Sequence, residues 1–201
     1  LMLHQTLIMG TGILGGEQNA QRLAGKDGYW LHVSPIKLLL VRTLIFVVIY
    51  WLLAIFYFGF SFDFYSVPHN ADLAELNLLI LPFLLSAALL GICLGLLLPR
   101  RELATLLVLL SSMPLIFGCG FIWPTTAIPA AITSVIQYVP VVPAINGFLH
   151  LNQMGADFSA ILLSWIQLWI CTGIYGFLAW LLLHLRHKQV KSVGVQPKDL
   201  G

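Results

Sequence analysis

Residues able to carry covalent or metal chemistry are few in this sequence, and their spacing matches no catalytic pattern. His184 and His187 share a helix face, but they stand among basic residues, where imidazoles are poor metal ligands. The serine motif at 59–62, Gly-Phe-Ser-Phe, lacks the second glycine of an intramembrane serine protease. His4 has no obvious partner for binding a haem. These patterns make an intramembrane enzyme the least favoured class.

Glycine motifs indicate helix packing and not nucleotide binding. Residues 10–15 spell G-x-G-x-x-G, but no strand or βαβ unit surrounds the motif. Gly12 and Gly16, and again Gly91 and Gly95, have the four-residue spacing of small-residue faces between membrane helices. The chain also lacks the G-x-x-x-x-G-K-[ST] phosphate loop, so any ATP hydrolysis must come from another polypeptide.

The composition points to a polytopic membrane protein. Of the 201 residues, 59% are hydrophobic and 9% are charged, against roughly 25% charged in a soluble domain. We predict one all-α membrane domain over 1–201, surrounded by lipid, with no separate soluble domain. Basic residues interleaved with aromatics are not clustered, so no nucleic-acid partner is expected.

Five apolar runs are predicted to span the bilayer, at about 1–16, 36–61, 76–98, 103–123 and 158–185. The first reaches only about 24 Å at 1.5 Å per residue, and a signal peptide is its less favoured alternative. Lys37 and Arg42 are expected to snorkel to the membrane surface from the second run. The polar loop 17–35 is either an interfacial segment anchored by Tyr29 and Trp30 or a docking surface for another protein.

The stretch 121–155 is apolar, contains no Lys, Arg, Asp or Glu, and is broken by prolines. Such backbone is tolerated at membrane depth only where protein shields it. We predict a re-entrant or interfacial helical hairpin over about 124–155. All ten basic residues fall on alternate connections or their flanks, and the positive-inside rule makes those connections and the C-terminus cytoplasmic. The hairpin is therefore predicted on the outer face.

Three segments carry a family resemblance: LHQTLIMGTGILGGE, SPIKLLLVRTLIFVVIY and CGFIWPTTAIPAAITSVIQYVPVVPAINGFLHLNQMGA. They resemble ABC-2-type transporter permeases, the membrane subunits of ATP-binding-cassette exporters. The third segment is similar to the family's outer-face signature. The family's usual layout has six spans and a large extracellular domain between the first two, whereas this sequence begins inside the second span. The resemblance therefore implies a fragment of a longer permease or a shortened one.

The resemblance also implies roles for particular residues. Coupling to the ATPase subunit would fall to Glu17, Arg22, Lys26 and Asp27. The translocation path would be lined by Gln5, Thr6, Ser111 and Ser112. Two outer helices, over 129–138 and 143–153, would form a gate that includes Pro124, Pro129, Tyr138, Pro140, Pro143, Asn152 and Gln153.

The function that the resemblance implies is export of an amphipathic or hydrophobic solute across a bacterial inner membrane. The chain would bind no cofactor or metal itself, and ATP with Mg²⁺ would be bound by the partner ATPase. It would pair with a second permease as a homodimer or heterodimer. The alternative is a non-transporting or degenerate scaffold or assembly subunit, which the missing first span and extracellular domain favour somewhat.

Overall fold

Helices form all the regular structure in the part of the chain that the computed structural model describes, residues 1–24, 33–65, 71–119 and 129–193. The predicted all-α class is therefore confirmed. In chain order the elements are α1 (Met2–Leu23), α2 (Pro35–Ile55) with a π-helical continuation (Phe56–Ser61), α3 (Phe62–Phe64), α4 (Leu73–Leu97), α5 (Arg101–Gly118), α6 (Ala130–Ile136), α7 (Val141–Phe148) with a π-helical continuation (Leu149–Gln153), a 3₁₀ turn (Phe158–Ile161) and α8 (Leu162–Val193).

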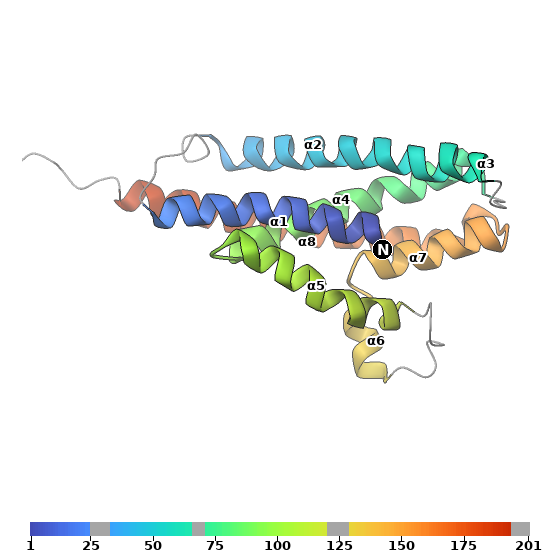
Figure 1. Cartoon of the computed structure of the whole chain (residues 1–201). Coiled ribbons are helices and arrows are strands. Elements are labelled where there is room, and N and C mark those ends of the chain that lie inside the picture. The colour runs from blue at the N-terminus through green and yellow to red at the C-terminus, as the bar shows by residue number, and fades with distance from the viewer. Residues whose placement is uncertain (25–32, 66–70, 120–128, 194–201) are drawn as a thin grey trace, which may run out of the picture.

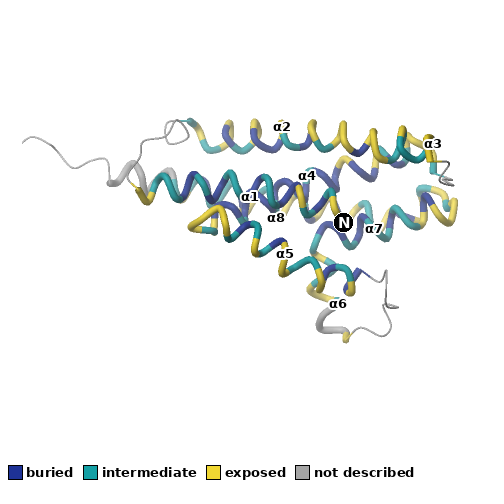
Figure 2. The backbone as a smooth tube through the Cα atoms, in the orientation of Figure 1, coloured by how far each residue is buried: buried dark blue, intermediate teal, exposed yellow. Residues whose placement is uncertain are grey.

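The long helices α1, α2, α4 and α8 run side by side, and α5 leaves them at an angle toward α6 (Figure 1). The helix α4 is the most enclosed of the apolar segments, with 72% of its most apolar stretch buried, against 33% for α2, 17% for α5 and 22% for α8. Exposed positions gather on the outer sides of α2 and α5 (Figure 2). Since α4 is apolar all round, it forms the core on which the other helices pack.

Four helical segments in the described ranges are long and apolar enough to cross a bilayer: Pro35–Ser61, Leu73–Leu97, Arg101–Gly118 and Phe158–Arg186. They correspond to the second to fifth predicted spans. The helix α1 is not among them, because its second half is polar, although its 22 residues reach about 33 Å. The first span, and with it the total of five, stays a prediction.

Helix boundaries differ from the predicted limits in three places. The helix α1 continues beyond Gly16 to Leu23, so the polar loop predicted over 17–35 begins as two further turns of helix. Most of those added residues are good helix formers, Glu, Gln, Ala and Arg among them. The helix α5 ends at Gly118, before the predicted limit at 123, and α8 continues past 185 to Val193.

Glycines set the distance between α1 and α4. A Cβ atom added to Gly95 would lie 2.9 Å from the carbonyl oxygen of Gly12, and one added to Gly15 would lie 2.6 Å from the carbonyl carbon of Gly95. One turn earlier in α4, a Cβ atom added to Gly91 would lie 2.8 Å from the Cα atom of Ile8 in α1. The two backbones therefore touch, as the small-residue faces predict. Gly16 packs instead on the backbone that begins α5.

Pro82 lies in the middle of α4, and α8 compensates for its missing N–H. A proline cannot donate to the carbonyl four residues earlier, which here belongs to Leu78. The indole N–H of Trp165 donates to that carbonyl at 3.0 Å, and the hydroxyl of Thr172 donates to the carbonyl of Pro82 at 3.3 Å. The proline thus becomes a point of polar contact between α4 and α8.

Candidate functional site

Charge is separated between the two ends of the bundle. We define the basic end as the end at which α1 and α4 finish and α2 and α5 begin (Figure 1). The described residues there include Arg22, Lys37, Arg100, Arg101 and Arg186, together with Glu17 and Glu102. At the opposite end, Asp72 and Glu75 begin α4, and Asp157 precedes α8.

At the basic end, the consecutive α1 residues Glu17, Gln18 and Asn19 reach different neighbours, and we call them the polar clamp. Glu17 pairs with Arg101 of α5, Oε2 to Nη1, at 3.3 Å. Gln18 accepts a hydrogen bond at Oε1 from Nη2 of Arg42 on α2. Successive side chains on a helix point about 100° apart at 3.6 residues per turn. Three neighbours on α1 can therefore contact several other helices at once.

Asn19 makes the most contacts of the polar clamp. Its Nδ2 lies 3.0 Å from the carbonyl oxygen of Gly95, 3.2 Å from that of Leu96 and 2.5 Å from that of Leu98. The last carbonyls of a helix have no donor within the helix, so this amide caps α4. Its Oδ1 accepts a hydrogen bond from Nη1 of Arg186 on α8. With a side chain only 4% exposed, Asn19 joins α1, α4 and α8 out of water.

The placement of Arg42 corrects the sequence interpretation. It was expected to snorkel to the membrane surface, yet it is 6% exposed and lies against Gln18. The cause is the extra length of α1, which brings the Gln18 carbonyl beside α2. A buried guanidinium needs such an acceptor, because burial without hydrogen bonds costs several kcal/mol.

Two of the four predicted coupling residues are placed by the structure. Glu17 is paired with α5, and Arg22 is partly buried near the end of α1. Lys26 and Asp27 lie outside the described residues. Their role in coupling stays a prediction.

Three of the four predicted path residues meet between α1 and α5. The amide Nε2 of Gln5 donates to Oγ of Ser112 at 2.7 Å, and Ser111 lies next to it with its hydroxyl bonded to the carbonyl of Val108 at 3.1 Å. Thr6 is exposed, and among the described residues its hydroxyl donates to the carbonyls of Met2 and Leu3 in its own helix. The structure therefore groups Gln5, Ser111 and Ser112 and leaves Thr6 apart.

A cavity of about 290 Å³, the α1–α5 cavity, lies beside these polar residues. Gln5 and Ser111 line it, as does His4, which the sequence interpretation left without a role. Its remaining lining is apolar and comes from α1, α4, α5, α6 and Val139: Ile8, Leu90, Leu94, Leu107, Val108, Pro114, Leu115, Ile136 and Val139.

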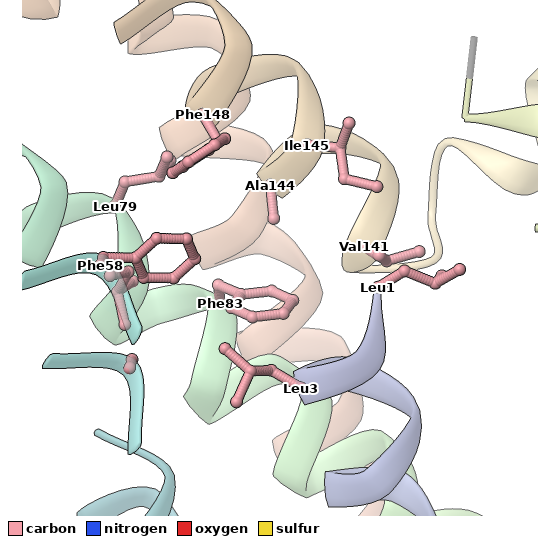
Figure 3. A pocket seen from close by; sticks show the side chains of 11 residues that line it. Leu1, Leu3, Phe58, Leu79, Phe83, Val141, Ala144, Ile145 and Phe148 are labelled. Atoms are coloured by element: carbon pink, nitrogen blue, oxygen red, sulfur yellow. The ribbon is translucent and has the colours of Figure 1, made fainter. Parts of the chain in front are cut away.

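A second cavity of about 220 Å³ is lined by apolar residues of α1, α2 and its π-helical continuation, α4 and α7. The rings of Phe58, Phe83 and Phe148 lie around it, with Ala144 between them on α7 (Figure 3). Phe83 also stacks on His4, with ring centroids 6.1 Å apart and an angle of 20° between the planes. His4 therefore stacks on a ring of this second cavity and itself lines the first.

The described gate residues lie just before α6, in the break between α6 and α7, in α7 and in its π-helical continuation. Pro129 precedes α6 and Pro140 precedes α7, where a fixed φ suits the start of a helix. The break packs on α8, since the carbonyl of Tyr138 accepts a hydrogen bond from the hydroxyl of Tyr175 at 2.7 Å. Pro143 and Asn152 are buried, whereas Gln153 is exposed.

Pro124 lies outside the described residues. The helices α6 and α7 with its continuation fall close to the predicted ranges 129–138 and 143–153. Whether this segment re-enters the membrane stays a prediction.

No three His, Cys, Asp or Glu side chains in the described ranges lie close enough to hold a metal ion. His184 stacks on Trp180, with centroids 5.5 Å apart. Several polar side chains of the bundle, among them Gln18, Asn19 and Trp165, make contacts between helices.

Comparison with protein families gives a match to the ABC-2 family transporter proteins over residues 6–181. The chain belongs to this family. As an ABC-2 protein it is a multi-pass membrane protein, and the family forms the membrane permease component of ATP-binding-cassette transporters, which typically pairs with an ATPase subunit. Comparisons with curated proteins and with solved structures gave no match.

The contacts of the polar clamp were missed by sequence reasoning, apart from a role for Glu17. A signal was present: Gln18 and Asn19 directly follow a glycine-rich apolar run, where buried amides can cap a neighbouring helix. Which helix they cap depends on packing, and that information is not local to the sequence.

Proposed function

We propose that this ABC-2 protein is the permease subunit of an exporter that moves an amphipathic or hydrophobic solute out of a bacterial cell. The observation that carries the proposal is the family match over 6–181, which includes nearly all of α1 and most of α8. ATP and Mg²⁺ would be bound by a separate ATPase subunit. A second permease, identical or related, would complete the translocation path.

The charge distribution supports an orientation in the inner membrane. By the positive-inside rule, the basic end and the C-terminus face the cytoplasm. The segment 17–35 then lies on the side of the ATPase, and α6 and α7 form the re-entrant gate on the outer side. Solute would leave past Tyr138 and Gln153.

The helix α1 is suited to transmit the ATPase movement. It leads from the segment that would dock on the ATPase to the α1–α5 cavity, and Gln5 lies about 21 Å along the helix from Asn19 at 1.5 Å per residue. Because the polar clamp ties α1 to α2, α4, α5 and α8, a push on its end would shift the bundle and not α1 alone. ATPase closure would thereby favour one of two bundle arrangements.

The test is co-purification with the ATPase and reconstitution of the complex in liposomes. Reversing charge at Arg22 and Lys26 should remove most stimulation of ATP hydrolysis, because the docking surface would repel its partner. The matched control is Glu75→Lys, a charge reversal at the opposite end of the bundle, which should leave stimulation intact. Unchanged stimulation in the double reversal would refute the docking assignment.

The scaffold alternative gives a different outcome in the same experiment. A stable complex in which ATP hydrolysis drives no export of any hydrophobic dye would identify a non-transporting subunit. Nucleotide-dependent export would exclude the scaffold.

A further inference from the structure

The break between α6 and α7, residues 137–140, interrupts the helical hydrogen bonding of this segment. Pro140 and Pro143 have no N–H, so the carbonyls four residues before them lose their helical donor. Those two carbonyls accept from N–H groups three residues later instead, at 2.8 and 3.0 Å. The carbonyls of Gln137 and Tyr138 fall between the two helices, and side chains donate to them.

The donors are three side chains of α8, Gln167, Cys171 and Tyr175, and we call them the α8 latch. Nε2 of Gln167 donates to the carbonyl of Gln137 at 2.8 Å. The hydroxyl of Tyr175 donates to the carbonyl of Tyr138 at 2.7 Å, and Sγ of Cys171 lies 3.4 Å from the same oxygen. Residues at four-residue spacing share one face of a helix. One face of α8 therefore holds two consecutive carbonyls of the break.

The latch lies beside the middle of an apolar helix. The segment Phe158–Arg186 is long and apolar enough to cross a bilayer, and at 1.5 Å per residue the latch lies about 14–26 Å along it from Phe158. Backbone carbonyls without donors are unfavourable at membrane depth. The break can therefore leave α8 only if water takes the place of the latch donors.

The same break forms part of the wall of the α1–α5 cavity. Ile136, at the end of α6, and Val139, within the break, both line this cavity, as do the path residues Gln5 and Ser111. Val141, directly after the break, is 1% exposed and lines the second cavity. A movement of the break away from α8 would therefore change the wall of the cavity beside the path residues.

We propose that the α8 latch positions the outer gate. Its bonds hold the break against α8 in the closed state, and their release opens the α1–α5 cavity to water from the outer side. The inference rests on the proposed function, because it names the residues that keep the gate of that exporter closed. Gln167 and Tyr175 are positioning residues, since they act through the backbone of the break.

The native Cys171 reports release of the latch. It is 1% exposed while the break lies against α8, and separation of the break would bring water to its thiol. The full-length protein in lipid nanodiscs is treated with a positively charged methanethiosulfonate reagent, and the labelling rate of each cysteine is measured by mass spectrometry. Tyr175→Phe removes one neutral hydrogen bond and should raise the rate at Cys171 about three- to tenfold. Gln167→Leu should act in the same direction, and the double variant should exceed either.

Two controls separate release of the latch from general loosening. Cys93 is 5% exposed, on the part of α4 that faces α8, and its Sγ lies 3.3 Å from the carbonyl of Tyr175. Its labelling rate should not change in the latch variants. Trp165→Phe is the matched variant, because it removes another bond from an α8 side chain to a backbone carbonyl, at 3.0 Å and to α4. It should leave the rate at Cys171 unchanged.

An unchanged rate at Cys171 in Tyr175→Phe would overturn the proposal. An equal rise at Cys93, or an equal rise at Cys171 in Trp165→Phe, would also overturn it, because the bonds would then be ordinary packing contacts. Failure of the permease function is read separately, since labelling needs no nucleotide or ATPase. A rise confined to the latch variants in a complex that exports nothing refutes only the exporter, and export with unchanged labelling refutes only the latch.

Discussion

Replacing Asn19 with alanine tests whether the polar clamp holds the basic end together. The substitution removes an amide that is 4% exposed, that donates to the last carbonyls of α4 and that accepts from Arg186. It leaves those carbonyls uncapped and deprives a partly buried guanidinium of an acceptor. We expect the helices to separate at this end while the apolar core around α4 remains packed.

The magnitude follows from the bonds lost. One amide nitrogen carries two hydrogens, so it makes two neutral hydrogen bonds at a time, each worth about 1 kcal/mol, and the bond from Arg186 is worth about 2 kcal/mol. Interhelical bonds in membrane proteins average nearer 0.6 kcal/mol, and Arg186 is only partly buried. The expected loss in free energy of unfolding is therefore about 2–4 kcal/mol.

The assay is unfolding by SDS titration in mixed micelles, followed by tryptophan fluorescence. Asn77→Ala is the matched control, because the side-chain amide of Asn77 makes its hydrogen bonds, to the carbonyl of Leu73 and from the indole of Trp51, where they are exposed. The loss in free energy of unfolding for this variant should stay below about 1 kcal/mol. A double-mutant cycle with Arg186→Ala should give a coupling energy above about 0.5 kcal/mol. A loss for Asn19→Ala no larger than that of the control would refute the reasoning.

Three further predictions concern helix contacts and orientation. Gly95→Ala should destabilise the bundle by about 1–3 kcal/mol, because its Cβ would press on the α1 backbone; Gly173→Ala, where nothing lies within 4 Å of the added Cβ, should be neutral or slightly stabilising in the same titration. Trp165→Phe should cost about 1 kcal/mol through the lost bond to α4, and the cost should shrink in a Pro82→Ala background, where the helix supplies the missing donor. Gln153→Cys should react with impermeant thiol reagents added outside the cell. The background should be low, since the three native cysteines are buried. Labelling from the cytoplasmic side alone would show that the proposed orientation is wrong.

The sequence predicts the parts of this fold that depend on average composition and regular spacing. The all-α class and the second to fifth apolar segments follow from hydrophobic runs, because a long apolar run favours a helix however the helices pack together. That Gly12 and Gly95 each lie at a close helix contact follows from small residues at four-residue spacing, whereas the pairing of the two helices does not. Both signals are local, and both are confirmed.

The parts that the sequence does not predict depend on partners far along the chain. Arg42 is buried because Gln18 lies beside it, and Gln18 lies there because α1 is longer than its apolar run. The cavity beside His4 is lined by side chains of α1, α4, α5 and α6, which come from distant parts of the chain. Helix directions and side-chain partners of this kind are set by tertiary packing, which no short window of residues records.

The contacts of Asn19 also bear on how the protein is made. Its partners on α4 lie 76 to 79 residues later in the chain, and Arg186 lies 167 residues later. During synthesis, α1 is made long before these groups exist, so these contacts form only after the later helices have been made. A chain that stops before α8 would keep the α4 bonds of the Asn19 nitrogen and would lack the donor to its oxygen, which comes from Arg186. The last helix therefore completes the hydrogen bonding of the first.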